Sequence, residues 1–213
     1  MCWVDLGSIR TIRKIRDIFG IDNFVETGTF MGINARVHSS DFKNVYSCEI
    51  NPNFFDKATN RCRDKPNVFI SNQDSKDFLK RFKGKQMFYL DAHFYNPNGP
   101  RWVVKDELKA IGRNTECVII IHDFDNGLGH CIYDGERLGL NVVGNLLRKV
   151  NPNFHYYTNR LEDCDIMTPD MATDAVMRDN LEYAHKTPRL TYRGILYAVP
   201  KKLPEGFNLA KWR

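Results

Sequence analysis

The sequence predicts a doubly wound α/β fold, in which helices cover both faces of a mostly parallel, seven-stranded sheet. Short apolar runs alternate with amphipathic stretches along the chain. The runs are continuous rather than alternately apolar and polar, as in parallel strands that are buried on both faces. A chain of 213 residues is long enough to bury one sizeable core. We therefore expect a single domain over residues 1–213.

The first half of the chain begins with a helix over 8–19, because Ser8 is a helix-capping residue type and isoleucines recur every third position after it. Pro52 suits the first turn of a later helix, where its missing N–H needs no partner. In order, we expect helix 8–19, strand 24–27, a helix ending near residue 40, strand 45–50, helix 52–64, strand 67–72, helix 75–82 and strand 86–91.

The second half contains the most hydrophobic run of the chain, CVIIIHD at 117–123, which predicts a central strand. Before it we expect a helix over 103–111. After it we expect a glycine-rich loop at 126–137, a helix over 141–150, a strand near Phe154 and a last strand at 192–200. The variable segment 160–190 lacks this pattern. It is either an insert that shapes a substrate pocket or a plain surface excursion.

Composition excludes several classes of protein. Hydrophobic residues make up 42% of the chain and charged residues 27%, which excludes a long disordered or collagen-like chain. The net charge of +5 is too small by itself to indicate nucleic acid as a partner. No apolar run approaches the roughly 18 residues of a membrane span, and the N-terminal stretch is charged where a signal peptide is apolar. We expect no membrane span and no secretion by that route.

Six cysteines are present without any C-x-x-C pair. An even number allows disulfides, but a chain of this length does not need them to hold its core. We therefore expect six reduced thiols and a cytoplasmic protein. The sequence leaves open whether the chain acts alone or as a homodimer.

Ligands of doubly wound sheets bind outside the carboxyl ends of the strands, so the residues that close each strand matter most. The first strand closes in ETGTFMG, where Gly28 and Gly32 allow the backbone to approach a ligand. This pattern is neither G-x-G-x-x-G nor a P-loop, which removes the main support for those nucleotide sites. A tight turn without a ligand is the alternative.

Acidic residues close the next two strands. Glu49 follows Gly28 by 21 residues, near the roughly 20-residue offset at which an acidic side chain meets a ribose in nucleotide-binding α/β folds. Asp74 and Ser75 follow the third strand. They either reach an adenine amino group or cap the helix that begins there.

Two carboxylates and two imidazoles close the fourth and fifth strands, namely Asp91, His93, His122 and Asp123. Burying such groups is costly unless they are paired or bind a cation. The carboxylates suit Mg²⁺ or Mn²⁺, and His122 shifts the preference toward Mn²⁺ or another transition metal. A hydrogen-bonded His–Asp network without a metal is the alternative.

These motifs together, FVETGTFMG, VYSCEINPNFFDKA, the Asp74–Ser75 step, FYLDAHF, DELKAIG and CVIIIHDF, resemble class I methyltransferases that use S-adenosylmethionine (SAM) and have a Rossmann-like fold. The resemblance covers roughly residues 10–160, and RGILYAVP is similar to the last strand of that fold. It is closest to small methyltransferase-like proteins of carbohydrate gene clusters. A looser resemblance is to metal-dependent sugar O-methyltransferases, in which aspartates after strands four and five hold Mg²⁺.

The resemblance implies a role for each strand end. Glu26, Gly28 and Gly32 would shape the pocket for the methionine part of SAM, with hydrogen bonds from Thr27 and Thr29. Glu49 would hold the ribose hydroxyls, and the adenine would lie by Asp74 and Ser75. Asp91 would border the donor and, with Asp123, hold the metal. His122 stands where the sugar enzymes often have another aspartate, so it would be the third ligand of a Mg²⁺ or Mn²⁺ ion.

The resemblance also implies an O-methyltransferase for a small molecule or glycan. A sugar hydroxyl needs a general base, a metal that lowers its pKa, or both. We expect His93 to be the base ahead of His122, with Asp91 beside them. The alternatives are an RNA or cap methyltransferase, disfavoured because no basic stripe with interleaved aromatics is evident, and a non-catalytic Rossmann-like binding module.

Overall fold

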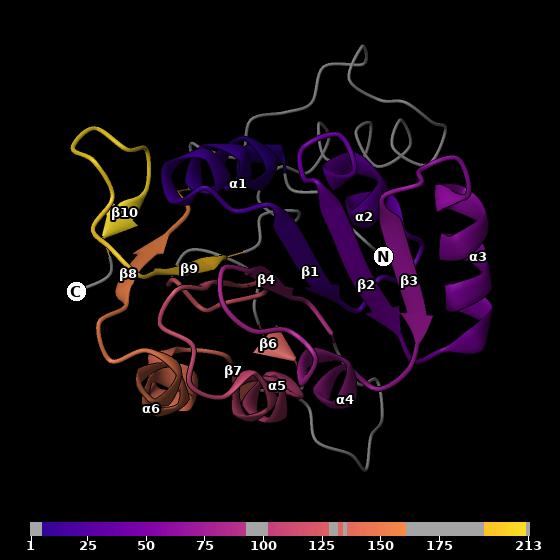
Figure 1. The fold of residues 1–213 in the computed structure, drawn as a ribbon. Coiled ribbons are helices and arrows are strands. Elements are labelled where there is room, and N and C mark those ends of the chain that lie inside the picture. The colour runs from indigo at the N-terminus through magenta and orange to yellow at the C-terminus, as the bar shows by residue number, and fades with distance from the viewer. Residues whose placement is uncertain (1–5, 93–101, 128–131, 134–135, 161–193, 212–213) are drawn as a thin grey trace, which may run out of the picture.

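The computed structural model describes residues 6–92, 102–127, 132–133, 136–160 and 194–211. Its centre is an eight-stranded sheet with the strand order β10-β8-β9-β5-β4-β1-β2-β3 (Figure 1). The five strands from β3 to β5 in this order pair in parallel. β9 lies antiparallel between β5 and β8, and β10 is antiparallel to β8. The chain reverses its winding direction at β1, so loops from both halves meet beside it.

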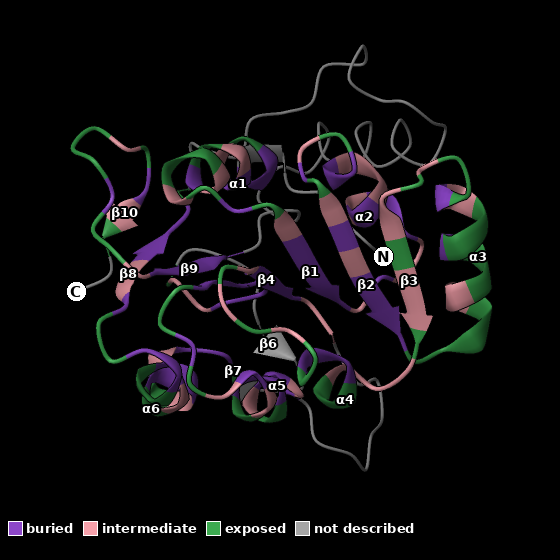
Figure 2. Ribbon diagram, in the orientation of Figure 1, coloured by how far each residue is buried: buried purple, intermediate pink, exposed green. Residues whose placement is uncertain are grey.

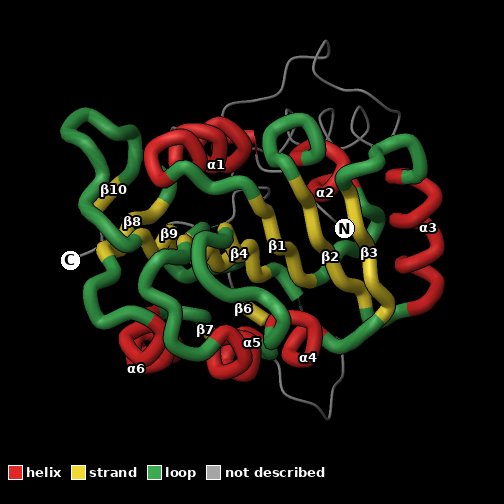
Figure 3. Tube along the Cα trace, in the orientation of Figure 1, coloured by secondary structure: helices red, strands yellow, loops and turns green. Residues whose placement is uncertain are grey.

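Helices and strands alternate along the chain from α1 to β5, and several strands follow one another after that (Figure 3). The strands are β1 (Asn23–Thr27), β2 (Asn44–Glu49), β3 (Val68–Asn72), β4 (Met87–Leu90), β5 (Val118–Ile121), β6 (Ile132–Tyr133), β7 (Glu136–Arg137), β8 (His155–Thr158), β9 (Leu196–Val199) and β10 (Ala210–Lys211). The helices are α1 (Leu6–Phe19), α2 (Ile33–His38), α3 (Pro52–Cys62), α4 (Ser75–Leu79), α5 (Val104–Ile111) and α6 (Leu140–Val150).

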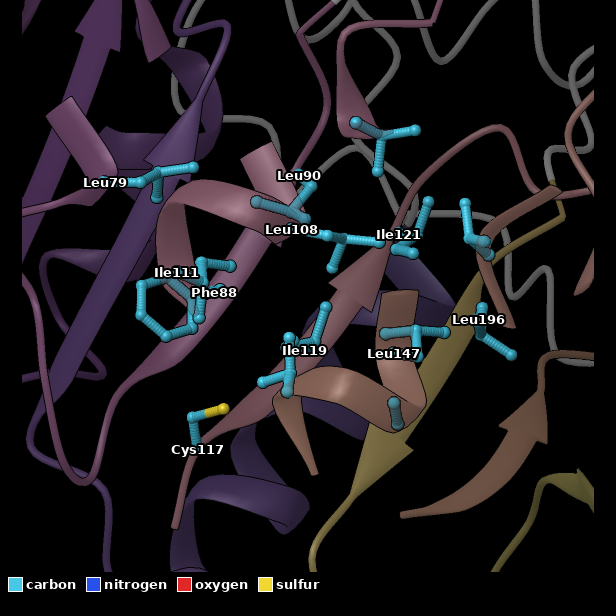
Figure 4. Packing of buried hydrophobic residues seen from close by; sticks show 14 of the residues in the cluster. Leu79, Phe88, Leu90, Leu108, Ile111, Cys117, Ile119, Ile121, Leu147 and Leu196 are labelled. Atoms are coloured by element: carbon cyan, nitrogen blue, oxygen red, sulfur yellow. The ribbon is translucent and has the colours of Figure 1, made fainter. Parts of the chain in front are cut away.

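The predicted doubly wound fold is confirmed. Helices α4, α5 and α6 lie along one face of the sheet, and α1, α2 and α3 lie on the other (Figure 1). Each face has its own apolar core. Figure 4 shows the core under α4–α6, where side chains such as Phe88, Ile119 and Leu147 interlock. The central strands are buried on both sides, which is why they read as continuous apolar runs (Figure 2).

The structure differs from the predicted elements in several places, and α4, for example, ends at Leu79 and not at residue 82. The first helix begins at Leu6, so Ser8 lies inside its first turn and is buried instead of capping it. Leu6 extends the three-residue spacing of apolar positions by one step, which explains the earlier start. An eighth strand, β10, joins the sheet edge, and β6 pairs with β7 within the stretch predicted as a loop. Strands of two residues carry no period that a sequence pattern can reveal.

The cysteine prediction is confirmed for the described part of the chain. Cys48, Cys62 and Cys117 are buried free thiols. Cys2, Cys131 and Cys164 lie outside the described residues, as does the variable segment apart from Arg160. The described helices include none that combines the length and the apolar character of a bilayer span.

Candidate functional site

The turn after β1 is built around two glycines with left-handed backbone. Gly28 has a φ of 77°, and a Cβ there would lie 2.8 Å from both Ala92 Cα and Asp91 O. Gly32 has a φ of 75°, and its Cβ would lie 2.9 Å from Ala58 Cα in α3. Both glycines are therefore required by close approach to other parts of the protein. Packing within the protein, the tight-turn alternative, thus accounts for both glycines, and the approach of a ligand to this turn stays a prediction.

The two threonines of this turn are engaged with protein groups. Thr27 is fully buried, and its Oγ1 accepts a hydrogen bond from Asp91 N at 3.3 Å. Thr29 is 2% exposed and its Oγ1 shares a short hydrogen bond with Ser47 Oγ. The threonines thus fix the turn to β4 and β2. Their predicted hydrogen bonds to a donor molecule stay a prediction.

Glu26 is a buried acid near the end of β1, with only 2% of its surface exposed. Its Oε1 accepts a hydrogen bond from Asn34 Nδ2 at 2.7 Å, and its Oε2 accepts one from Ser47 Oγ at 2.6 Å. Burial raises the pKa of this carboxyl to about 8, against the opposing effect of the two hydrogen bonds. Burial therefore favours the protonated form of Glu26.

Glu49 closes β2 and holds the next loop in place. Its Oε2 accepts a hydrogen bond from Phe30 N at 2.8 Å, and its Oε1 accepts one from Asn51 N at 2.9 Å. A carboxylate offers about four lone-pair sites, so each oxygen can accept one further donor. The two hydroxyls of a ribose fit this capacity. The Phe30 backbone has a φ of 50°, an uncommon conformation that the hydrogen bond to Glu49 supports.

Replacing Glu49 with alanine should weaken SAM binding by about 1.5–3 kcal/mol, the scale of hydrogen bonds to a charged group. Isothermal titration measures the change. Because the substitution also frees two backbone N–H groups, thermal unfolding must show that the variant is folded. Glu116→Ala, at an exposed residue just before β5, is the matched control. Unchanged affinity in folded Glu49→Ala protein would refute the ribose assignment.

Asp74 is the N-cap of α4, which was the structural alternative for this residue. Its Oδ1 accepts a hydrogen bond from Lys76 N at 3.0 Å, and its Oδ2 lies 3.2 Å from Lys76 Nζ. Ser75 is the first helical residue and is partly exposed. Capping accounts for the presence of Asp74 without a ligand, and contact of this pair with adenine stays a prediction.

Asp91, His122 and Asp123 form a compact cluster beyond the ends of β4 and β5. Leu90 and Ile121 are register partners, so the residues that follow them emerge side by side. His122 Nδ1 lies 3.0 Å from Asp91 Oδ1 and 3.4 Å from Asp123 Oδ1. Asp123 has a φ of 53°, which turns its chain sharply after the strand. The three predicted ligands are thus brought together.

The cluster fits a divalent cation. One ligand atom from each residue lies within 4.8 Å of the other two. Two ligands at right angles around an ion with bonds of about 2.1 Å are about 3.0 Å apart, close to the distances from His122 Nδ1. Two carboxylates and one imidazole suit Mn²⁺ and, less closely, Mg²⁺. The same contacts also describe a His–Asp network without a metal, so both interpretations stay open.

Hydrogen bonds join the segment that follows Asp123 to Asn159 and to residues 194–195. Phe124 N donates to Gly194 O at 2.8 Å, and a Cβ on Gly194 would lie only 1.9 Å from Phe124 O. Asn159 Oδ1 accepts hydrogen bonds from Ile195 N at 2.8 Å and from Asn126 Nδ2 at 3.2 Å. Hydrogen bonds thus join Asn159 directly to Ile195 and to Asn126.

His93, the expected base, lies outside the described residues. The sequence analysis missed Asn34 and Ser47, which hold Glu26, and Asn72, whose Nδ2 donates to Glu49 O at 2.7 Å. Each is a polar residue whose function depends on a partner distant in sequence. A single sequence carries no signal for such pairs.

Comparisons with known proteins identify the fold. No protein-family model matches the chain, and no curated protein matches it in sequence. A Staphylococcus aureus protein provisionally assigned as a caffeoyl-CoA O-methyltransferase matches with a TM-score of 0.56 at 14% identity, over 93% of this chain and 85% of that one. An rRNA methylase from Streptococcus thermophilus matches with a TM-score of 0.52 at 10% identity, over 95% and 99%.

A third solved structure was obtained with ligands. It is the geranyl diphosphate C-methyltransferase of Streptomyces coelicolor A3(2), in complex with Mg²⁺, geranyl diphosphate and S-adenosyl-L-homocysteine. It matches with a TM-score of 0.51 at 10% identity, over 91% of this chain and 81% of that one. The names of these proteins indicate very different acceptors. The likeness therefore confirms the expected methyltransferase-type, Rossmann-like fold and carries no information on the acceptor.

Proposed function

We propose that the protein is a SAM-dependent O-methyltransferase that acts on a hydroxyl of a sugar or glycan with the help of a divalent cation. The observation that carries the proposal is the Asp91–His122–Asp123 cluster beside the glycine turn of a methyltransferase-type fold. The turn supplies a place for the donor, and the cluster supplies groups that can activate an acceptor hydroxyl. A fold of this type alone would need neither the cluster nor the buried acids.

The donor fits the strand ends by its charge. SAM carries a sulfonium and an ammonium group, and three carboxyl groups, those of Glu26, Glu49 and Asp91, come from three adjacent strand ends. Glu49 would hold the ribose hydroxyls, and the turn around Gly28 would hold the methionine part. SAM supplies an activated methyl group. The protein has to hold the acceptor in line with it and remove the acceptor proton.

The acceptor hydroxyl would be activated at the cluster. A cation held by Asp91, His122 and Asp123 would lower the pKa of a hydroxyl beside it. His122 Nδ1 lies 3.0 Å from Asp91 Oδ1 and 3.4 Å from Asp123 Oδ1, close enough for the three groups to act together. His93 is the proposed base that takes the proton. If no metal binds, His122 and the aspartates would form the acid–base network themselves.

An RNA methyltransferase is the second candidate, favoured by one surface feature. Phe69 is 47% exposed and stacks on Tyr46 with ring centroids 5.3 Å apart. The guanidinium of Arg81 lies 5.6 Å from the ring centroid of Phe82, which in turn packs against Tyr46. Aromatic rings beside cations bind single-stranded nucleic acid. However, Tyr46 and Phe69 lie on β2 and β3, and β1 lies between β2 and β4, after which the cluster stands.

Methyl transfer from labelled SAM to a panel of nucleotide sugars, free glycans and RNA tests the proposal. We expect incorporation into a saccharide that is lost in His93→Ala protein or acquires a different pH profile. Incorporation into RNA, with binding that weakens as salt rises, would favour the second candidate. A folded protein that never consumes SAM with any acceptor would be a binding module, and the proposed function would be wrong.

A further inference from the structure

The net negative charge at the carboxyl ends of the central strands depends on whether Glu26 is protonated. Glu26, Glu49 and Asp91 come from the adjacent strands β1, β2 and β4, and the charges of Asp91 and Glu49 oppose ionisation of Glu26. The groups that act most strongly on the Glu26 carboxyl also include Asn34 and Ser47, so all four are neutral or anionic. No cation among these four offsets the burial of Glu26.

A chain of hydroxyls lets Glu26 change its protonation state in place. Thr29 Oγ1, Ser47 Oγ and Glu26 Oε2 follow one another within hydrogen-bond distance. When Glu26 is ionised, Ser47 donates to Glu26 and Thr29 donates to Ser47. When Glu26 is protonated, it donates to Ser47, and Ser47 donates to Thr29. Asn34 donates to Oε1 in both states. Neither state requires a heavy atom to move.

We propose that binding of the donor expels this proton, so that Glu26 is a neutral acid in the free protein and a carboxylate when SAM is bound. The inference rests on the proposed function, because it takes a cationic amino-acid derivative to be the ligand. An arriving ammonium or sulfonium group adds positive charge beside a buried acid, which favours the ionised form. The proton passes to solvent, and the new carboxylate balances the charge of the donor. Glu26 is thus a positioning residue whose charge appears only with its ligand.

The pH dependence of donor affinity tests this coupling. Below pH 8, the free protein must lose a proton to bind, so SAM affinity should rise about tenfold from pH 6 to pH 7 and level off above pH 8. The α-amino group of SAM titrates in a similar range, so the wild type is compared with Glu26→Gln at each pH. Glutamine resembles the neutral acid in shape and hydrogen bonding. The ratio of the two affinities should carry the pH dependence.

Counting protons gives a second measure. Titration calorimetry at pH 7 in buffers of different ionisation heat should show nearly one more proton released by the wild type than by Glu26→Gln. Ser47→Ala removes a donor that favours the ionised form. Its plateau should therefore move to higher pH. Glu116→Gln, at an exposed glutamate, should behave like the wild type.

A readout without the donor completes the test. Carbon NMR of the free protein should show one glutamate carboxyl that titrates near pH 8 and is missing from Glu26→Gln. If that carboxyl is already ionised at pH 6, or if wild type and Glu26→Gln release equal numbers of protons, the inference is wrong while the proposed function stands. If SAM binds at no pH, both are wrong.

Discussion

Replacing Gly28 with alanine is expected to weaken SAM binding at least about 100-fold, or about 2.7 kcal/mol, the largest effect of any single change on the donor site. An alanine Cβ would lie 2.8 Å from Asp91 O and from Ala92 Cα, so the turn and the end of β4 must move apart. The left-handed φ of 77° adds about 1–2 kcal/mol of strain for any residue with a side chain. Valine should be worse, because it adds a branch at Cβ. Titration calorimetry measures the affinity.

Gly20 supplies the matched control for Gly28. It also has a left-handed φ, of 59°, but a Cβ there would meet nothing within 4 Å. Gly20→Ala should therefore lose stability through backbone strain while it keeps its donor affinity. Thermal unfolding of both variants separates the cost of backbone strain, which both share, from the cost of the steric clash, which only Gly28→Ala has. Normal SAM affinity in folded Gly28→Ala protein would show that this turn is not the donor loop.

Removing the divalent cation is expected to lower the rate of methyl transfer at least about 100-fold and to do so reversibly. A cation beside the acceptor stabilises the developing alkoxide, an effect of several kcal/mol in metal enzymes. Asp123→Asn should reproduce the loss, and it should also weaken Mn²⁺ binding measured by electron paramagnetic resonance. Asparagine tolerates the left-handed backbone at this position nearly as well as aspartate. The substitution therefore tests the charge and not the turn.

Asp125 is the control for this substitution. Its Oδ1 accepts a hydrogen bond from Gly127 N at 3.0 Å, and it lies outside the cluster of three. Asp125→Asn should keep both metal binding and most of the rate, while Asp123→Asn should keep its SAM affinity. Full turnover by EDTA-treated, metal-free protein would contradict the proposed role of the cation. The cluster would then act as a His–Asp acid–base network without a metal.

The fold was predictable because its signals are local. Continuous apolar runs mark the buried parallel strands, and Pro52 and the glycines mark where helices start and turns occur. The strand ends were predictable for the same reason: Asp91 and His122 each follow a recognisable strand, and parallel strands bring their carboxyl ends to one edge. Because ligands bind outside the carboxyl ends of parallel strands, the position of the cluster could be predicted without knowing any side-chain contact.

What escaped prediction depends on tertiary contacts. Nothing local indicates that Gly28 lies against Asp91 and Ala92 just after β4, or that Ser47 pairs with Glu26 on the neighbouring strand. The capping role of Asp74 and an adenine role are equally compatible with the same residue types. The left-handed backbone of Phe30 is held by Glu49 and is unfavourable in isolation. These features arise from packing, which one sequence does not reveal.

Asn159 is one residue on which two segments near the cluster depend. Its Oδ1 accepts hydrogen bonds from both Ile195 N and Asn126 Nδ2, and Asn159 is only 5% exposed. Because a substitution that removes a buried acceptor takes it from every donor that it serves, the cost exceeds that of a single hydrogen bond. Asn126 lies three residues beyond Asp123, so a change at residue 159 would disturb the chain next to the cluster, although the two positions are far apart in the sequence.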